Sequence, residues 1–182
     1  MKRREVIKRT ALLMGGVVSA PAILGILKGC TAKPGVEWNP EFITQDQAYV
    51  ITEMAEIIIP KTDTPGAKEA GVPAFIEQMV FKAYSPDNRD KFIADLTDFM
   101  TESDFSELSS EKQKEYVFLA HEKAVTEKLR SDKSFVMAMK ELTMLGFFTS
   151  QPGATQVLQY EAVPGGYSGC QPLSEVGRTW AT

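Results

Sequence analysis

The sequence predicts an all-α protein, an irregular bundle of about five helices followed by a long, loop-rich C-terminal segment. From residue 41 onward, apolar residues recur at the spacing of one helical face, and capping residues precede several of these runs. No alternating apolar and polar run is long enough to build a sheet. The chain has 182 residues, 43% of them apolar and 24% charged, which suits one domain with its own core.

The first helices of the body are marked by their boundaries. Thr44 and Gln47 have the spacing of a capping box, and the apolar run after them ends at Pro60, which stops the helix. Residues 60–73 contain three prolines and two glycines, which predicts an ordered loop. Residues 74–84 then form a short helix.

Two longer helices follow. Ser85 and Pro86 begin one of them, because proline suits the first turn of a helix. Its apolar side chains share one face: Phe92, Ile93, Leu96 and Phe99. Ser110 and Gln113 have capping-box spacing at the start of the next helix. The apolar side chains of that helix are Tyr116, Leu119, Ala120, Val125 and Leu129.

The last long helix, capped by Asp132 or Ser134, is the most apolar in the chain. Because apolar side chains nearly surround it, we expect it to be central in the bundle. These side chains are Phe135, Val136, Met137, Met139, Leu142, Met144, Leu145, Phe147 and Phe148. Gln151, Pro152 and Gly153 predict its end. Residues 154–160 fit a strand or a helix, and residues 161–182 are expected to be mostly loop.

A basic leader precedes an acidic body. Residues 1–29 carry six basic side chains and one acidic side chain, whereas the rest of the chain carries 14 basic and 23 acidic ones. Residues 11–27 are uncharged but are interrupted by three glycines and a proline, which favours an export signal over a membrane span. Arg3, Arg4 and Lys8 fit the pattern of a twin-arginine signal, which normally exports folded proteins. A general secretory signal and an uncleaved anchor are the alternatives.

Cys30 follows Leu27, Lys28 and Gly29 in a sequence similar to a lipoprotein cleavage site. Cleavage before Cys30 leaves a lipid-modified cysteine that anchors the protein at a membrane. The alternative is a cysteine that merely lies near an ordinary cleavage site. The predicted organisation is a signal peptide over residues 1–29, a tether over residues 30–42 and a helical domain over residues 43–182. We therefore expect a periplasmic, membrane-anchored protein.

Residues that carry catalytic chemistry are sparse. One histidine and two cysteines exclude a zinc finger and a ferredoxin-type cluster, and the acidic balance argues against a nucleic-acid partner. The sequence has no glycine-rich phosphate loop and no Gly-x-Ser-x-Gly motif. We expect His121 to be a surface or core residue. Four aspartates are expected to form a solvated helix face: Asp87, Asp90, Asp95 and Asp98. No catalytic, cofactor-binding or metal-binding residue is assigned to this chain.

The C-terminal segment holds the residues that we expect to contact a partner. Large aromatic side chains in a loop are suited to anchoring an interface, and three stand here: Tyr160, Tyr167 and Trp180. If Cys30 is lipidated, Cys170 has no partner within the chain. Its thiol is then a structural group, half of an intermolecular disulfide, or a group beside the redox centre of a partner.

Several separated motifs resemble those of the gluconate 2-dehydrogenase subunit 3 family, in the same order. They are PKTDTPGAKEAGVP at residues 60–73, KELTMLGFFTS at 140–150 with GAT at 153–155, YEAVP at 160–164 and GYSGC at 166–170. The similarity spans residues 43–181, and the twin-arginine leader is also typical of the family. None of these motifs is catalytic.

The resemblance implies the small subunit of a periplasmic, membrane-associated sugar or polyol dehydrogenase. In such complexes the large subunit, of the glucose-methanol-choline oxidoreductase type, holds FAD and oxidises the sugar. A c-type cytochrome commonly passes the electrons onward, so c-type haem or an iron–sulfur cluster is expected only in partner subunits. The small subunit supplies the export signal and helps the large subunit to mature. The implied partners are the flavoprotein, the cytochrome, the twin-arginine translocase and the membrane.

Three functions are compatible with the sequence. The first is a non-catalytic escort and stabilising subunit of an FAD-dependent sugar or gluconate dehydrogenase. The second is a free-standing periplasmic lipoprotein that binds a small ligand or another protein. The third is an enzyme in its own right, for which the sequence offers no motif.

Overall fold

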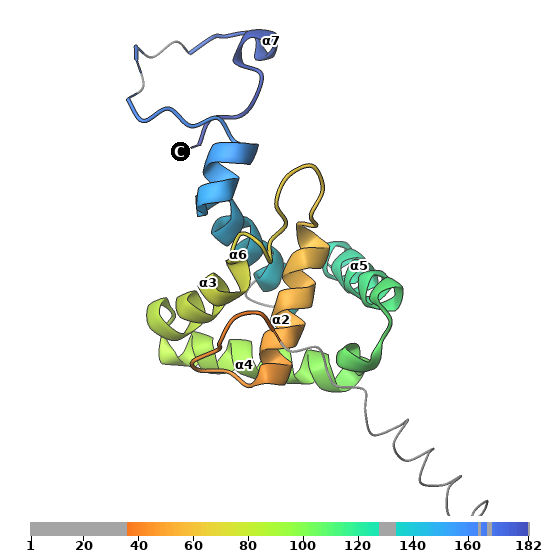
Figure 1. The fold of residues 1–182 in the computed structure, drawn as a ribbon. Coiled ribbons are helices and arrows are strands. Elements are labelled where there is room, and N and C mark those ends of the chain that lie inside the picture. The colour runs from red at the N-terminus through yellow and green to blue at the C-terminus, as the bar shows by residue number, and fades with distance from the viewer. Residues whose placement is uncertain (1–35, 128–133, 164, 167–168, 182) are drawn as a thin grey trace, which may run out of the picture. The chain divides into compact units, whose positions relative to one another are not determined.

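The structure is a computed structural model that describes residues 36–127, 134–163, 165–166 and 169–181 (Figure 1). Residues 36–182 form one compact unit. Several residues singled out in the sequence lie outside the described residues: Arg3, Arg4, Lys8, Leu27, Lys28, Gly29, Cys30, Leu129, Asp132 and Tyr167. Their roles therefore stay predictions.

The all-α prediction is confirmed for the described residues, which contain five α-helices of seven residues or more and no strand. These helices are α2 (Gln45–Ile58), α3 (Val72–Gln78), α4 (Pro86–Ser103), α5 (Ser110–Thr126) and α6 (Phe135–Thr149). Shorter helical segments are the π-helical turns η1 (Met79–Ala83) and η3 (Gly153–Val157), the 3-10 turn η2 (Phe105–Glu107) and the short helix α7 (Leu173–Val176).

Two predicted helix starts are confirmed by their hydrogen bonds. At α2, the Gln47 amide donates to Thr44 Oγ1 at 3.2 Å and the Thr44 amide donates to Gln47 Oε1 at 3.0 Å, which completes the capping box. At α4, Ser85 Oγ accepts from the Asn88 amide at 3.3 Å, and Pro86 occupies the first turn. Helix α2 ends at Ile58, shortly before Pro60, as expected.

The predicted capping box at Ser110 is wrong, because Ser109 is the N-cap residue of α5. The Gln113 side chain is buried instead of reaching back to the cap. Its amide donates to the carbonyl of Phe105 at 2.9 Å and to Tyr49 Oη at 3.3 Å. A buried amide satisfies these acceptors in the core, and that gain outweighs a solvent-exposed cap.

The sequence predicted that the helix ends at Gln151, Pro152 and Gly153. In the structure the helix is interrupted at Ser150 alone. The chain becomes helical again from residue 151 and continues through η3, so residues 154–160 are mostly helical and not a strand. Ser150 Oγ accepts from the Gly153 amide at 3.1 Å, which starts the second helical segment. Only glycine fits at position 153, because a Cβ there would lie 1.9 Å from the Phe147 carbonyl oxygen.

Helix α2 contacts α3, α4, α5 and α6, and so lies at the centre of the helical body (Figure 1). Four of its apolar side chains are buried: Val50, Ile51, Met54 and Ala55. A cluster of aromatic rings packs between α4, η2, α5 and α6, with neighbouring centroids 5.2–5.5 Å apart. Its members are Phe92, Phe99, Phe105, Tyr116 and Phe135. Burial of this apolar surface is the main source of stability for the body.

The segment before α2 is fixed to the body by one buried carboxylate. Glu77 of α3 is 2% exposed, and its Oε1 accepts from the amides of Glu41, Phe42 and Ile43 at 2.8–3.2 Å. Trp38 Nε1 also donates to Thr52 Oγ1 at 3.1 Å. The last residues of the predicted tether therefore pack with the helical domain.

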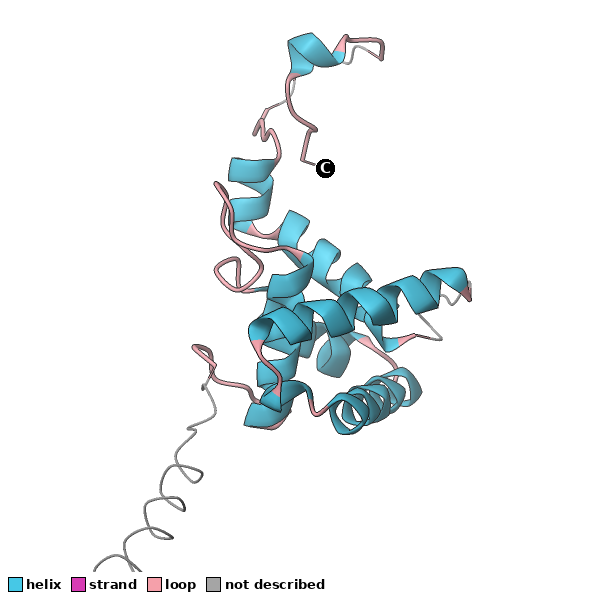
Figure 2. Cartoon of the chain, turned by 90° about the vertical axis from the view of Figure 1, so that its right-hand side faces the viewer, coloured by secondary structure: helices cyan, strands magenta, loops and turns pink. Residues whose placement is uncertain are grey.

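The loop-rich C-terminal segment is confirmed, and it closes on itself (Figure 2). The Gln159 amide donates to the Thr179 carbonyl at 2.8 Å, and the Ala181 amide donates to the Gln159 carbonyl at 2.9 Å. Arg178 Nη1 donates to the Gln156 carbonyl at 2.6 Å. We call the segment between these closing contacts, residues 158–181, the C-terminal loop.

Candidate partner-binding surface

The two sides of α6 are both apolar, but only one of them is covered. The inner side is buried: Phe135, Val136, Met139, Leu142 and Phe147. On the outer side Met144, Leu145 and Phe148 are 44%, 47% and 37% exposed. The expectation that α6 is central is confirmed, because it contacts α2, α3, α4, α5 and η3. Its outer side is nevertheless left open by the described part of the chain.

Helix α5, which contacts α6, also exposes apolar side chains. Phe118 is 61% exposed and Val125 is 53% exposed, and a spacing of seven residues places them on the same side of the helix. Leu119 is 58% exposed but lies about 100° further round the helix. Leu119 and Val125 are among the apolar positions named from the sequence, whereas the buried apolar side chains of α5 are Val117 and Ala124. We call Phe118 and Val125, with Met144, Leu145 and Phe148, the α5–α6 face.

A groove of about 200 Å³ opens where the end of α2 meets α5 and α6. Two of its lining side chains are polar, His121 of α5 and Lys140 of α6. The others are apolar: Ile57, Ile58, Val117, Phe118 and Val136. Since Phe118 belongs to both, this groove, which we call the Lys140 groove, adjoins the α5–α6 face.

Lys140 and His121 contact each other inside this groove. Lys140 Nζ lies 3.0 Å from His121 Nε2, and both side chains are half-buried. An ammonium group can only donate, so Nε2 is the acceptor and the proton of the neutral ring is on Nδ1. No ion pair with a carboxylate is formed by Lys140 among the described residues, and the side chains that line the groove with it include no carboxylate. The groove thus holds an uncompensated positive charge.

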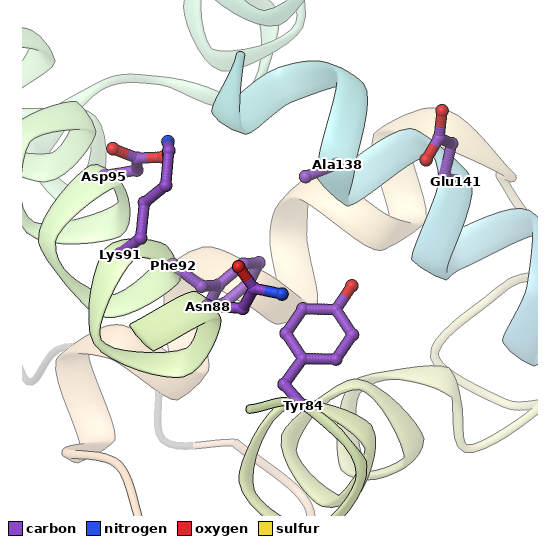
Figure 3. Close-up of a pocket in the computed structure, with 7 residues that line it drawn as sticks. All are labelled: Tyr84, Asn88, Lys91, Phe92, Asp95, Ala138 and Glu141. Atoms are coloured by element: carbon purple, nitrogen blue, oxygen red, sulfur yellow. The ribbon is translucent and has the colours of Figure 1, made fainter. Parts of the chain in front are cut away.

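A second hollow, of about 190 Å³, lies on the other side of α6 and is more polar. Figure 3 shows Tyr84 and Asn88 extending into the space between α4 and α6, with Glu141 of α6 across from them. Lys91 and Asp95 form an ion pair at its edge, with Nζ and Oδ2 2.5 Å apart. Burial raises the pKa of the Tyr84 hydroxyl above 10, and the Glu141 carboxylate adds to the rise. Tyr84 is therefore a neutral hydrogen-bond donor at pH 7.

The side chains that line the Lys140 groove include no hydroxyl, thiol or carboxylate. His121, the only imidazole in the chain, contacts an ammonium group instead of a hydroxyl, thiol or carboxylate. Among the described residues, no group of three His, Cys, Asp or Glu side chains is placed to hold a metal ion. The arrangement is suited to binding apolar protein surface.

The chain also matches a family model. The model is that of gluconate 2-dehydrogenase subunit 3, and the match covers residues 45–165, more than half of the chain. The chain belongs to this family. Membership supports an accessory subunit of a dehydrogenase complex. No curated protein and no solved structure matches the chain.

The part of the chain shared with the gluconate 2-dehydrogenase subunit 3 family runs from α2 into the C-terminal loop. It contains the whole α5–α6 face, the Lys140 groove and Tyr160. Cys170 and Trp180 lie beyond its end. The matched region is therefore the helical body with the first part of the C-terminal loop, residues 158–165.

The C-terminal loop places its predicted contact residues at the surface. Tyr160 is 60% and Trp180 39% exposed, and they lie close together because Gln159 forms a β-bridge with Trp180. Cys170 is exposed and forms no disulfide. It is therefore not a buried structural thiol, while its contact with a partner stays a prediction, as it does for Tyr160 and Trp180.

The acidic side chains of α4 lie at its surface. Asp87, Asp90 and Asp98 are exposed, and Asp95 is half-buried in its ion pair with Lys91. No helix of the described residues has the length and apolar character needed to cross a membrane.

The α5–α6 face is the feature that sequence reasoning missed. Its signal was present in α6, which has more apolar residues than one buried side requires.

Proposed function

We propose that this chain is the non-catalytic accessory subunit of an FAD-dependent sugar dehydrogenase complex, and that it binds the large subunit through the α5–α6 face. The large subunit, of the glucose-methanol-choline type, carries FAD and the oxidation chemistry. A c-type haem or an iron–sulfur cluster belongs to further subunits. Family membership supports the accessory role, and the binding surface is inferred from the exposed side chains.

The exposed apolar face of α5 and α6 is the observation that supports this proposal. Its five side chains include two phenylalanines and a methionine, residue types that are enriched in protein interfaces. Apolar surface left open on a monomer commonly marks a binding site. Covering each large side chain stabilises the complex by about 1–2 kcal/mol.

Binding of this kind explains how a subunit without a reactive group supports an enzyme. A partner that binds only the folded large subunit shifts that subunit's equilibrium toward the folded state. Folded, FAD-loaded protein is also the form that the twin-arginine route exports. We therefore propose that the chain stabilises the large subunit in the cytoplasm and escorts it to the periplasm, where lipid on Cys30 holds the complex at the membrane.

Two aspartate substitutions test the binding surface. Phe118→Asp places a charge in the α5–α6 face, and Leu119→Asp places the same charge on the neighbouring residue, outside that face. Both side chains are similarly exposed, at 61% and 58%, so neither change should unfold the free chain. We expect Phe118→Asp to abolish co-purification with the FAD-bearing large subunit and Leu119→Asp to preserve it.

The folded state of both variants is checked by circular dichroism, and binding is measured with co-expressed, affinity-tagged chains. Equal retention of the flavoprotein by both variants would exclude the α5–α6 face as the binding surface. Oxidation of a sugar by the purified chain alone would overturn the non-catalytic role.

The escort role is tested separately in the leader. Replacing Arg3 and Arg4 together by lysine keeps the positive charge but removes the arginine pair. We expect both this chain and the large subunit to stay in the cytoplasm, as measured by cell fractionation and flavin content. Continued export of the large subunit would contradict the escort role and leave the binding surface unaffected.

A further inference from the structure

We propose that the Lys140 groove receives the carboxylate of an aspartate or glutamate from the large subunit, at the centre of the interface. This inference rests on the proposed function and adds to it the chemistry of the partner. It assigns a specific task to the Lys140–His121 pair, which apolar packing alone does not explain.

The first argument is the state of the Lys140 charge. The Lys140 side chain is half-buried and lines the groove together with Phe118, Val136 and the end of α2, so its surroundings hold less water than an open surface does. Within the described residues its polar contact is His121 Nε2, at 3.0 Å, which uses one of its three N–H donors. A neutral imidazole compensates a buried charge less well than a carboxylate does. The remaining donors are thus available to an incoming carboxylate.

The second argument is the position of the charge within the surface. Met144 lies one turn beyond Lys140 on α6, and Phe118 lies nearly one turn before His121 on α5. Exposed apolar side chains therefore flank the polar pair. A charge that lies beside exposed apolar side chains loses water when a partner covers them, and a carboxylate of the partner would then compensate it.

The groove fits an acidic side chain on an apolar protein segment better than a sugar acid. A sugar acid carries hydroxyl groups along its whole length, and each of them needs a hydrogen-bond partner. The groove offers only His121 and Lys140, while Ile57, Ile58 and Val117 would face hydroxyl groups. An aspartate or glutamate presents one carboxylate, and its neighbours can cover the apolar wall.

Zero-length coupling with a carbodiimide identifies the carboxylate directly. The reagent joins an amine to a carboxylate that touches it, and mass spectrometry of the assembled complex names both residues. We expect Lys140 to be coupled to an aspartate or glutamate of the large subunit. Coupling to a second copy of this chain, or to the chain's own carboxylates, would overturn the inference.

The outcomes separate this inference from the proposed function. If the two subunits form no complex, the proposed function itself fails. If they form a complex but Lys140 couples to no carboxylate of the large subunit, only the present inference fails.

Lys140→Met measures what the charge contributes, because methionine keeps the length and apolar character of the side chain. A groove that binds apolar groups alone should bind the large subunit at least as tightly after this change. We expect instead about tenfold weaker binding or more, because the partner's carboxylate is left unpaired. Lys123→Met, on the exposed surface of α5 away from the groove, is the control and should leave the affinity unchanged. Unchanged or tighter binding of Lys140→Met would contradict the inference.

A charge exchange completes the test. Lys140→Glu should abolish binding, and replacing the coupled carboxylate residue of the large subunit by lysine should restore it. An unfolded Lys140→Glu chain could not be rescued, so its fold is checked first. If the folded variant still does not bind the lysine-substituted large subunit, Lys140 does not pair with that carboxylate.

Discussion

The inner and outer sides of α6 carry the same kinds of residue in different surroundings. Met139 is fully buried and Met144 is 44% exposed, while Phe147 is 2% and Phe148 37% exposed. The two methionines are five positions apart in the sequence, and the two phenylalanines are adjacent. Hydrophobicity made both sides candidates for the core, but only the inner side meets α2 and α3. The comparison teaches that the number of available neighbours, and not the apolar character of α6, decided which side was buried.

The pair Met139 and Met144 gives the largest expected contrast. Met139→Ala removes a side chain that is fully buried and should lower the free energy of unfolding by about 2–5 kcal/mol. Met144→Ala should change it by about 0.5 kcal/mol or less, because the side chain is partly in water already. Urea unfolding followed by circular dichroism measures both. Equal losses would mean that the outer side of α6 is covered in the free protein.

A smaller loss of stability is expected at Gly146, where α3 approaches the inner side of α6. A Cβ at Gly146 would lie 2.5 Å from Cδ1 of Phe75, so Gly146→Ala forces the ring to move. Overpacking of this kind costs about 1–3 kcal/mol, which offsets or exceeds the gain of about 1 kcal/mol in helix propensity. The net result should be a loss of stability in urea unfolding. Gly165→Ala, where an added Cβ meets nothing within 4 Å, is the control, and a gain in the Gly146 variant would contradict the close contact.

We expect a gain in stability at Thr143, on the inner side of α6. Among the described residues, its hydroxyl is the buried side-chain group without a hydrogen-bond partner. Thr143 Oγ1 is buried without a hydrogen-bond partner, so Thr143→Val removes a buried polar atom and keeps the shape. Stability should rise by about 1 kcal/mol. Thr149→Val is the control, because Thr149 Oγ1 is exposed and donates to the Leu145 carbonyl at 2.7 Å. If Thr143→Val lowers the stability as much as Thr149→Val does, the Thr143 hydroxyl has a hydrogen-bond partner in solution.

The smallest effect concerns Tyr84, beside the outer side of α6. Burial, and then the Glu141 carboxylate, raise the pKa of Tyr84 above 10, so the unfolded chain releases this proton first as the pH rises. The stabilising contribution is complete below pH 10 and is lost as the pH rises through the pKa of the folded state. Phenolate absorbance, compared with that of Tyr84→Phe, isolates this group. Glu141→Gln should lower the pKa of Tyr84 but leave it above 10, since burial is the larger cause; a pKa of 10 in that variant would reverse the ranking.

Local signals predicted most of the helix boundaries correctly. Thr44 with Gln47, Ser85 with Pro86, and Pro60 act through hydrogen bonds and ring geometry within a few residues, so their effect does not depend on the rest of the fold. The errors arose where a distant group competed. Gln113 left its expected cap because the Phe105 carbonyl and the Tyr49 hydroxyl needed a donor in the core.

The site was predictable only in part. Tyr160, Trp180 and Cys170 were predicted from the sequence to contact a partner, and they are exposed in the C-terminal loop. The α5–α6 face and the Lys140–His121 contact were missed, because 19 residues separate the two polar side chains and their meeting depends on how α5 packs on α6.

The sequence alone determined the helical class, several helix ends, the basic leader and the scarcity of reactive groups, since composition and short-range spacing carry this information. Only the tertiary structure decided which side of α6 lies in the core and which side stays exposed. Both sides carry large apolar side chains, and burial of a side chain depends on what packs against it, a property of the whole arrangement and not of the helix itself.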